Sequence, residues 1–464
     1  MAKGGTSYTT GGVVTDKPKS ALDDWRLRAG LSNKEFAREI TTRAAARGHN
    51  HVVPDATTVR RWIEGSKPRP PVPDLIADLI SDKLGYRVTT YDLGLGEPHS
   101  DRGLIYHQSV SDSIESVADL GRADVDRRRF LTAAPFVALA GLGPSRDWLL
   151  NTLEQLPRAG QRVHLDDVTA LRDMFSKFQE IDIFQGGGSG RLVLAAYMNN
   201  HVYPLLRRSQ SAEVHHQLYG AVAEQTYLLG WMAFDNGEHG VAQRYLIQAL
   251  RLAEESRDPA IGAHVLAGLA DQATLLGNPA EGRRLAQAGR HGLRATDSHA
   301  CMADLWTLEA RALAATGERS ATITALTQAE KAFEQVDTDS EPEWARFIDP
   351  AYIHGEIANA FRDIGCPDEA ELHANRSIEH AKSQGRARRG AMSNAALAAA
   401  HLHRGDLEAA HAAGIRTLTL SKRVKSTRSV QAVRDVHLRM ARLGGPDHPL
   451  VREFGELTHS ALNA

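Results

Sequence analysis

Cysteine is almost absent from this chain of 464 residues, which has only Cys301 and Cys366, far apart in the sequence. A disulfide framework needs several cysteines and a cysteine-based zinc site needs closely spaced ones, so neither can be built. Two isolated thiols fit a reducing compartment. We therefore expect a cytoplasmic protein.

Long hydrophobic runs are missing as well. No stretch approaches the roughly 20 apolar residues that a membrane helix requires, so we expect no membrane association. The run RRRFLT at residues 127–132 is similar to a twin-arginine export signal, but such signals act at an N-terminus. We interpret this run as the start of a helix at a domain junction.

The usual motifs of catalysis are also lacking. There is no nucleophile elbow, no metal-ligand spacing and no recognisable pair of carboxylates. The run GGGSG at 186–190 lacks the Gly-Lys-Ser/Thr ending of a phosphate loop, so we interpret it as a hinge between helices. The histidines at 215, 216, 401 and 403 are interpreted as solvated or packed side chains. We expect no enzyme activity, no catalytic residues, no metal and no cofactor.

Aromatic residues make up only 6% of a chain that is rich in alanine, leucine and arginine. These residues lose little entropy in a helix, so the composition favours an all-α fold. The length indicates two to four domains, or one domain and an extended array.

The net charge of −2 hides a division along the chain. Residues 1–90 hold 15 Lys/Arg against 10 Asp/Glu, a net charge of +5, whereas residues 91–126 hold 2 against 8, a net charge of −6. We predict a disordered Gly/Thr-rich N-terminus at 1–18, a basic domain at 19–88, an acidic linker at 89–126 and a helical array at 127–464.

Residues 20–85 carry the start and stop signals of four short helices. The first is expected to end at Gly30, and SNKE at 32–35 is a capping box that starts the second. Asp55 is expected to cap the third, which ends at Gly65, and residues 74–84 form the fourth. The residues expected to face the core are Phe36, Ala37, Ile40, Ala56, Val59, Ile63, Leu75, Ile76, Leu79 and Ile80.

This segment resembles the repressor-type helix-turn-helix domain. The resemblance rests on SNKEFAREI at 32–40, for the first helix of the motif, and on DATTVRRWIEGSKPRP at 55–70, for the recognition helix and its exit. In that family, residues near the start of the recognition helix reach base edges in the major groove. The resemblance implies base contacts from Thr57, Thr58 and Arg61. The implied phosphate-binding residues are Ser32, Lys34, Arg60, Lys67 and Arg69.

One feature departs from the family pattern, because Thr41–Val53 stands where the family has a very short turn. Either the second helix is long or the turn is enlarged. The alternative interpretation of the segment is a small helical interaction domain with a solvated basic helix.

Internal repetition is the strongest signal in the rest of the chain. Glycines predicted to separate two helices recur at steps of 40, 40, 48 and 40 residues, at positions 237, 277, 317, 365 and 405. A large residue and then a small one stand eight and seven positions before each glycine, and a small residue stands five positions after it. Glu309 breaks the apolar pattern, so the third repeat is the weakest.

These frames resemble the tetratricopeptide repeat, most clearly over residues 222–420, although other α-solenoids remain open. Helical hairpins of that family stack and form a curved groove lined by the first helix of each repeat. The resemblance implies a groove that could hold an extended peptide. By position, the groove residues are Glu224, Tyr227, Trp231, Asp235, His264, Asp271, Arg311, Asn359 and Arg362.

The combination is similar to bacterial peptide-sensing quorum regulators and to regulators of development and antibiotic production in filamentous bacteria. It implies a transcription regulator that binds double-stranded DNA as a homodimer and senses a peptide, a small molecule or a protein effector. The alternative is a repeat-based protein-interaction scaffold that binds no operator DNA.

Overall fold

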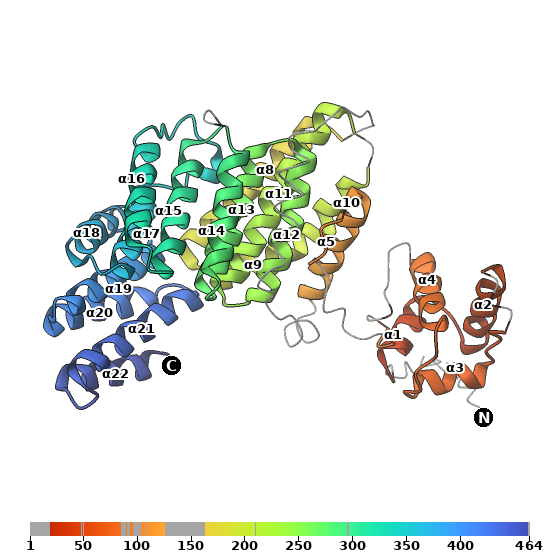
Figure 1. Ribbon diagram of the computed structural model, residues 1–464. Coiled ribbons are helices and arrows are strands. Elements are labelled where there is room, and N and C mark those ends of the chain that lie inside the picture. Colours follow the sequence, from red (N-terminus) through yellow and green to blue (C-terminus); the bar gives the residue numbers. More distant parts are fainter. Residues whose placement is uncertain are drawn as a thin grey trace, which may run out of the picture. The chain divides into compact units, whose positions relative to one another are not determined.

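The computed structural model describes residues 19–47, 49, 51–84, 90, 93–95, 104–107, 109–125, 163–208, 210–294 and 297–462. Every regular element in these ranges is helical, as the composition predicts (Figure 1). None of these helices is both long and apolar enough to cross a lipid bilayer. The chain divides into two compact units, which we name the head (residues 1–100) and the body (residues 101–464). The predicted disordered N-terminus and the run at 127–132 lie outside the described residues.

Four helices form the described part of the head: α1 (Ala21–Arg28), α2 (Asn33–Ala46), α3 (Ala56–Ile63) and α4 (Val72–Leu84). Polar side chains cap α2 and α3 as predicted. The Ser32 side chain accepts a hydrogen bond from the backbone of Glu35, whose carboxylate bonds back to the backbone N–H of Ser32. The Asp55 side chain accepts from the backbone N–H of Thr58. These bonds satisfy N–H groups that have no partner within the helix.

The core of the head is built from apolar residues at helical spacing. The buried residues include Phe36, Ala37, Ile40, Val59, Ile63, Leu75, Ile76, Leu79 and Ile80, as predicted. Ala56 is exposed instead, because it lies in the first turn of α3 beyond the edge of the core. Leu93 is buried in the same core, so the head continues past residue 88.

Part of the predicted acidic linker, residues 89–126, is helix α5 (Val110–Val125) of the body. Ile114, Val117 and Leu120 on α5 are buried in the core of the body. Their spacing of three residues places them on one face of the helix. The prediction of a linker is therefore wrong over α5, because the acidic residues obscured a short apolar stripe.

Six helical hairpins follow in the described part of the body. They are α11 (Ala212–Asp235) with α12 (His239–Ser256), α13 (Pro259–Leu275) with α14 (Pro279–Gly292), α15 (His299–Ala315) with α16 (Arg319–Phe333), α17 (Pro350–Asp363) with α18 (Pro367–Ser383), α19 (Ala387–His403) with α20 (Leu407–Ser421), and α21 (Thr427–Gly444) with α22 (Pro449–Leu462). The elements between residues 163 and 208 are α8 (Leu165–Gln185), α9 (Gly187–Tyr197), the π-helical turn η1 (Met198–Val202) and α10 (Tyr203–Leu206). A 3₁₀ turn, η2 (Glu343–Ala345), precedes α17.

The predicted turn glycines close the hairpins. Gly237, Gly277, Gly317, Gly365 and Gly405 have φ between 69° and 80°. A side chain is strained in this left-handed region, which explains why glycine recurs there. Gly445 has φ 83° and closes the last hairpin at the same step, so the repetition extends to α22.

Small residues separate the paired helices, as the repeat pattern predicts. A Cβ atom on Gly230 of α11 would lie 3.0 Å from Leu246 Cγ of α12. Glu309, which breaks the apolar pattern, is buried in α15. It accepts hydrogen bonds from Gln287 at 2.7 Å and Arg290 at 2.5 Å, both on α14. The third hairpin therefore keeps the common geometry by pairing the buried charge.

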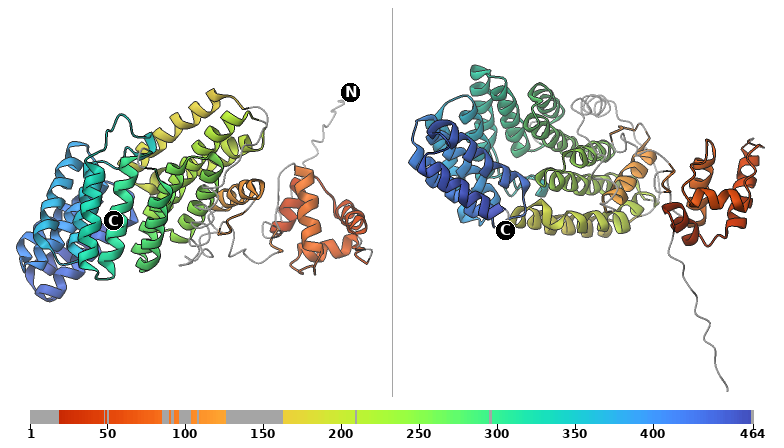
Figure 2. Two further views of the ribbon diagram at one scale, coloured as in Figure 1. Left: turned by 45° about the horizontal axis from the view of Figure 1, so that its top comes forward. Right: turned by 90° about the horizontal axis from the view of Figure 1, so that it is seen from below.

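The array curls until residues far apart in the sequence meet. The backbone N–H of Lys425 donates to the carbonyl oxygen of Gln185 at 2.7 Å, and the Lys425 carbonyl accepts from the N–H of Gly188 at 3.2 Å. The Ser426 hydroxyl donates to the Asp235 carboxylate at 2.9 Å. Figure 2 (right) shows blue α21 beside the yellow-green helices of α8 and α9. We name the contact of residues 425–427 with residues 185–188 and 235 the latch.

The run GGGSG at 186–190 is a packing site and not the predicted hinge. A Cβ atom on Gly187 would lie 2.5 Å from the carbonyl oxygen of Met232, and one on Gly186 would lie 2.4 Å from that of Lys425. Backbones approach this closely only where side chains are absent. The glycines therefore let α9 and the latch pack tightly.

Candidate functional site

Helix α3 presents a polar face opposite its buried face. Thr57, Arg60 and Arg61 are exposed, whereas Val59 and Ile63 are buried. Thr58 is engaged locally, because its hydroxyl donates to the Asp55 carboxylate at 2.7 Å. This hydrogen bond and the one from the Thr58 backbone lower the pKa of Asp55.

The other predicted DNA-binding residues lie on α3, just beyond its end and at the start of α2. Arg60 pairs with Glu64 at 2.9 Å on the surface, and Lys67 and Arg69 are exposed beyond the end of α3. At the start of α2, the Ser32 hydroxyl donates to the Glu35 carboxylate at 2.6 Å. An anion of the chain itself thus lies at this helix terminus, where Ser32 was expected to meet a phosphate.

The connection between α2 and α3 resolves the departure noted in the sequence. Helix α2 continues to Ala46, and residues 47–55 then lead to α3. Both proposed explanations apply, since the helix is long and the turn is enlarged. A tight helix-turn-helix connection has about three or four residues.

The body holds a pocket on the inner side of its curved array. The pocket spans about 640 Å³ between side chains, its open mouth included. Helices α8, α11, α17, α19 and α21 contribute to it, with the segment after η2. The lining residues are Phe175, Gln179, Asp182, Ile183, Tyr227, Leu228, Trp231, Phe347, Tyr352, Arg386, Arg388, Arg389, Met392 and Arg428.

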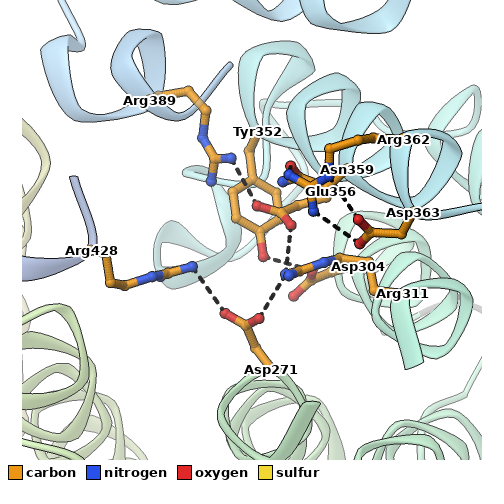
Figure 3. A network of polar contacts seen from close by, with 10 residues as sticks. All are labelled: Asp271, Asp304, Arg311, Tyr352, Glu356, Asn359, Arg362, Asp363, Arg389 and Arg428. Atoms are coloured by element: carbon orange, nitrogen blue, oxygen red, sulfur yellow. Dashed lines mark hydrogen bonds and ion pairs between the residues drawn. The ribbon is translucent and has the colours of Figure 1, made fainter. Parts of the chain in front are cut away.

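A chain of alternating charges runs beside the pocket (Figure 3). Arg428 lies 3.4 Å from Asp271, which pairs with Arg311 at 2.8 Å. Arg311 also pairs with Glu356 at 2.8 Å, and Glu356 pairs with Arg389 at 2.8 Å. This charge chain thus runs from Arg428 to Arg389. Both of these arginines line the pocket.

Two further arginines of the lining pair with other carboxylates. Arg388 lies 2.6 Å from Asp182 and 2.9 Å from Asp235, and it joins α19 to α8 and α11. Arg386 lies 2.5 Å from Asp349. These pairs connect elements that are distant in the sequence, so they help to hold the helices around the pocket together.

Aromatic rings cover several of these charges. The Arg428 guanidinium lies 5.2 Å from the Trp231 ring centre and 4.6 Å from that of Phe234. Arg389 lies 4.6 Å from the Tyr352 ring centre. A ring face attracts a cation and keeps its surroundings apolar.

Burial and pairing shift the acidity of the carboxylates here. Burial alone would raise the pKa of Glu356, but the Arg311 and Arg389 guanidinium groups lower it to about 2. Burial raises the pKa of Asp304 to about 8, although Asp304 accepts a hydrogen bond from the Tyr352 hydroxyl at 2.9 Å. Charge is thus held on Glu356 and disfavoured on Asp304.

Two of the predicted ligand residues line the pocket, and several others lie near it. Tyr227 and Trp231 line the pocket, and Asp271 and Arg311 belong to the charge chain behind it. Asn359 accepts a hydrogen bond from Arg362 at 2.7 Å (Figure 3).

Of the nine predicted groove residues, the seven other than Tyr227 and Trp231 lie outside the pocket lining, Glu224 and His264 among them. Glu224 is buried near Arg172, at 3.9 Å. His264 packs on Tyr227, with their ring centres 3.9 Å apart. In the described part of the body and head, no group of three or more His, Cys, Asp or Glu side chains is arranged to hold a metal ion.

Sequence reasoning missed the arginines that define the pocket, but three of them carried a signal. Arg386, Arg388 and Arg389 stand at the cap and in the first turn of α19. Cations at a helix N-terminus are disfavoured by the helix dipole, so three within four residues is unusual without a compensating role. Arg428 carried no such signal, because its place at the pocket depends on how α21 packs against the rest of the array.

A family model described as the SP15 N-terminal domain matches residues 22–96. No curated protein matches the chain. The matched range includes Leu93 and Leu95, which both pack on the core of the head. The match and the packing therefore agree that this unit extends beyond residue 88.

Proposed function

We propose that the chain is a sequence-specific DNA-binding transcription regulator of the cytoplasm, whose tetratricopeptide-like body dimerises and senses an effector. The observation that carries the proposal is the surface of α3. Its buried face anchors it to the core of the head, and its outer face presents a hydroxyl and two guanidinium groups. An α-helix of this kind fits the major groove of DNA.

In this proposal, Thr57 and Arg61 contact base edges, and Arg60, Lys67 and Arg69 contact phosphates. An arginine suits guanine because its planar fork matches two acceptor atoms of that base. Two heads of a dimer would contact half-sites about 34 Å apart along the DNA. The distance between the heads therefore determines the affinity for the operator.

The body supplies the regulatory part of the proposal. An effector in the pocket contacts α8, α11, α17, α19 and α21 at once. An effector that binds one arrangement of these helices better than another shifts the population toward that arrangement. The spacing of the heads in the dimer would then change with effector concentration.

Arg61→Ala is expected to lower the affinity for a specific DNA site by about 1–3 kcal/mol, because a bidentate contact to a base is lost. The measurement is fluorescence anisotropy with a DNA site selected by the purified chain from a random pool, and with a scrambled site. Arg60→Ala is the matched control on the same helix. It should weaken the binding of both DNAs alike, because a phosphate contact carries no sequence information.

Equal losses on both DNAs in the Arg61 variant would make Arg61 a phosphate contact. If no salt-sensitive, sequence-preferring complex is selected at all, the regulator proposal is wrong. The repeat-based scaffold then becomes the better explanation.

A further inference from the structure

The surface of the pocket is positively charged, although the charges around it balance. The lining includes four arginines, Arg386, Arg388, Arg389 and Arg428, against one carboxylate, that of Asp182. The other carboxylates that pair with these arginines are absent from the lining. A molecule in the pocket therefore meets guanidinium groups first and their partners only behind them.

Arg428 has the longest ion-pair distance of these four arginines. Its carboxylate partner in the described part of the body is Asp271, at 3.4 Å. Asp271 is also held by Arg311 at 2.8 Å, so it does not depend on Arg428. A guanidinium has five N–H donors in a planar fork, which suits a bidentate anion.

The rest of the lining is apolar and mostly flat. Apart from the polar side chain of Gln179, it consists of Phe175, Ile183, Tyr227, Leu228, Trp231, Phe347 and Met392, with Tyr352 beneath Arg389. Tyr227 and Trp231 lie one helical turn apart on α11, with ring centres 6.4 Å apart and an interplanar angle of 13°, so together they form one aromatic wall. Such walls accept an aromatic or other flat apolar body by stacking.

The latch limits the length of what can enter. It joins the end of α8 to the start of α21, next to the pocket residues Ile183 and Arg428. An extended peptide that follows the inner face of the array would have to cross these backbone hydrogen bonds. We therefore expect the occupant of the pocket to be a compact molecule.

We propose that the pocket binds a compact organic anion, with its flat apolar body between the aromatic walls and its anionic group on Arg428 and Arg389. This inference rests on the proposed function, because it names the chemical class of the effector. The anion would occupy the arginines at both ends of the charge chain. Binding would thereby add a bridge between α19 and α21, which already pack on each other.

The test uses the purified full-length chain and two fluorescent probes that share one aromatic body. Anilinonaphthalene sulfonate carries a negative charge, and N-phenylnaphthylamine carries none. We expect the sulfonate to bind with one high-affinity site, and Arg428→Gln to weaken that site by about tenfold through the lost charge-assisted contact. The affinity for the neutral probe should change by less than about twofold.

Arg404→Gln is the matched control, since Arg404 forms ion pairs with Asp368 and Glu371 on the surface of the body. Its affinity for the sulfonate should equal that of the unmodified chain. Circular dichroism melting checks the fold of each variant. If Arg428→Gln lowers the melting temperature, Arg428→Lys is used in its place. It should still lower the affinity for the sulfonate by about threefold, because an ammonium lacks the planar fork.

An unchanged sulfonate affinity in a folded Arg428 variant would overturn the proposal, as would equal losses for the two probes. DNA binding is measured on the same samples. Sequence-specific DNA binding without charge-dependent probe binding would support the regulator proposal and contradict the anion site. Charge-dependent probe binding without sequence-specific DNA binding would support the anion site and contradict the regulator proposal.

Discussion

Glu356→Gln is expected to destabilise the body by about 3–5 kcal/mol at neutral pH. The Glu356 side chain is buried between Arg311 and Arg389, at 2.8 Å from each. Glutamine keeps the size of the side chain but removes its charge. Two guanidinium groups would then be held together in a low-dielectric environment with one carboxylate fewer.

The measurement is the free energy of unfolding from urea denaturation, followed by far-UV circular dichroism. Glu371→Gln is the matched control, because Glu371 pairs with Arg404 on the surface. An exposed ion pair contributes at most about 1 kcal/mol, so this variant should be close to the unmodified chain. A loss of less than 1 kcal/mol in Glu356→Gln would show that the charge chain is not important for stability.

The effect of Glu356→Gln on the free energy of unfolding should also depend on pH. The pKa of Glu356 is about 2 in the folded body, below its ordinary value of 4.5. A depressed pKa means that the ionised carboxylate stabilises the fold above about pH 5 and that this contribution is lost as the pH falls toward 2. The difference in stability between the unmodified chain and Glu356→Gln should therefore narrow over this interval. A constant difference would contradict the ion-pair explanation.

Gly186→Ala is the second substitution for which we expect a large effect, because it should break the contacts of the latch. Gly186 has φ 85° and ψ 159°, a conformation essentially confined to glycine, which costs another residue about 1–3 kcal/mol. Its added Cβ would also lie 2.4 Å from the carbonyl oxygen of Lys425. The strain and the collision together should separate residues 425–427 from the end of α8.

Hydrogen exchange reports this opening directly. The backbone N–H groups of Lys425 and Gly188 donate the two backbone hydrogen bonds of the latch, so their exchange should accelerate by at least about tenfold in Gly186→Ala. Gly445→Ala is the matched control. Gly445 also ends a helix, with φ 83° and ψ 155°, but an added Cβ there meets no atom within 4 Å.

Gly445→Ala should therefore cost stability through backbone strain alone and leave the exchange at the latch unchanged. If both variants accelerate exchange at Lys425 equally, the effect is global. If neither does, the backbone contact at Gly186 is dispensable for the latch.

Local signals predicted much of the secondary structure. The capping box at Ser32, the cap at Asp55 and the turn glycines each depend on neighbouring residues, so their consequences are visible in a short window. Helix α5 was missed because its apolar stripe is short and lies among acidic residues. The predicted series of turn glycines ended at Gly405, so the turn of the sixth hairpin at Gly445 was not assigned.

The sequence predicted only some of the residues at the candidate pocket. Tyr227 and Trp231 were found because they lie on the first helix of a repeat, at positions where the repeat pattern implies an inner face. The charge chain joins residues from α13, α15, α17, α19 and α21, and no local pattern pairs Asp271 with Arg428. Such pairs depend on the curvature of the whole array.

The sequence by itself determined that this protein is helical, where its hairpins turn and which face of α3 is polar, because these properties arise from contacts within one or two helical turns. The tertiary structure alone decided that residues 425–427 meet residues 185–188 and that four arginines converge on one pocket. The physical reason is that small rotations between successive hairpins accumulate along the array. Their sum brings distant residues together, and no single repeat encodes it.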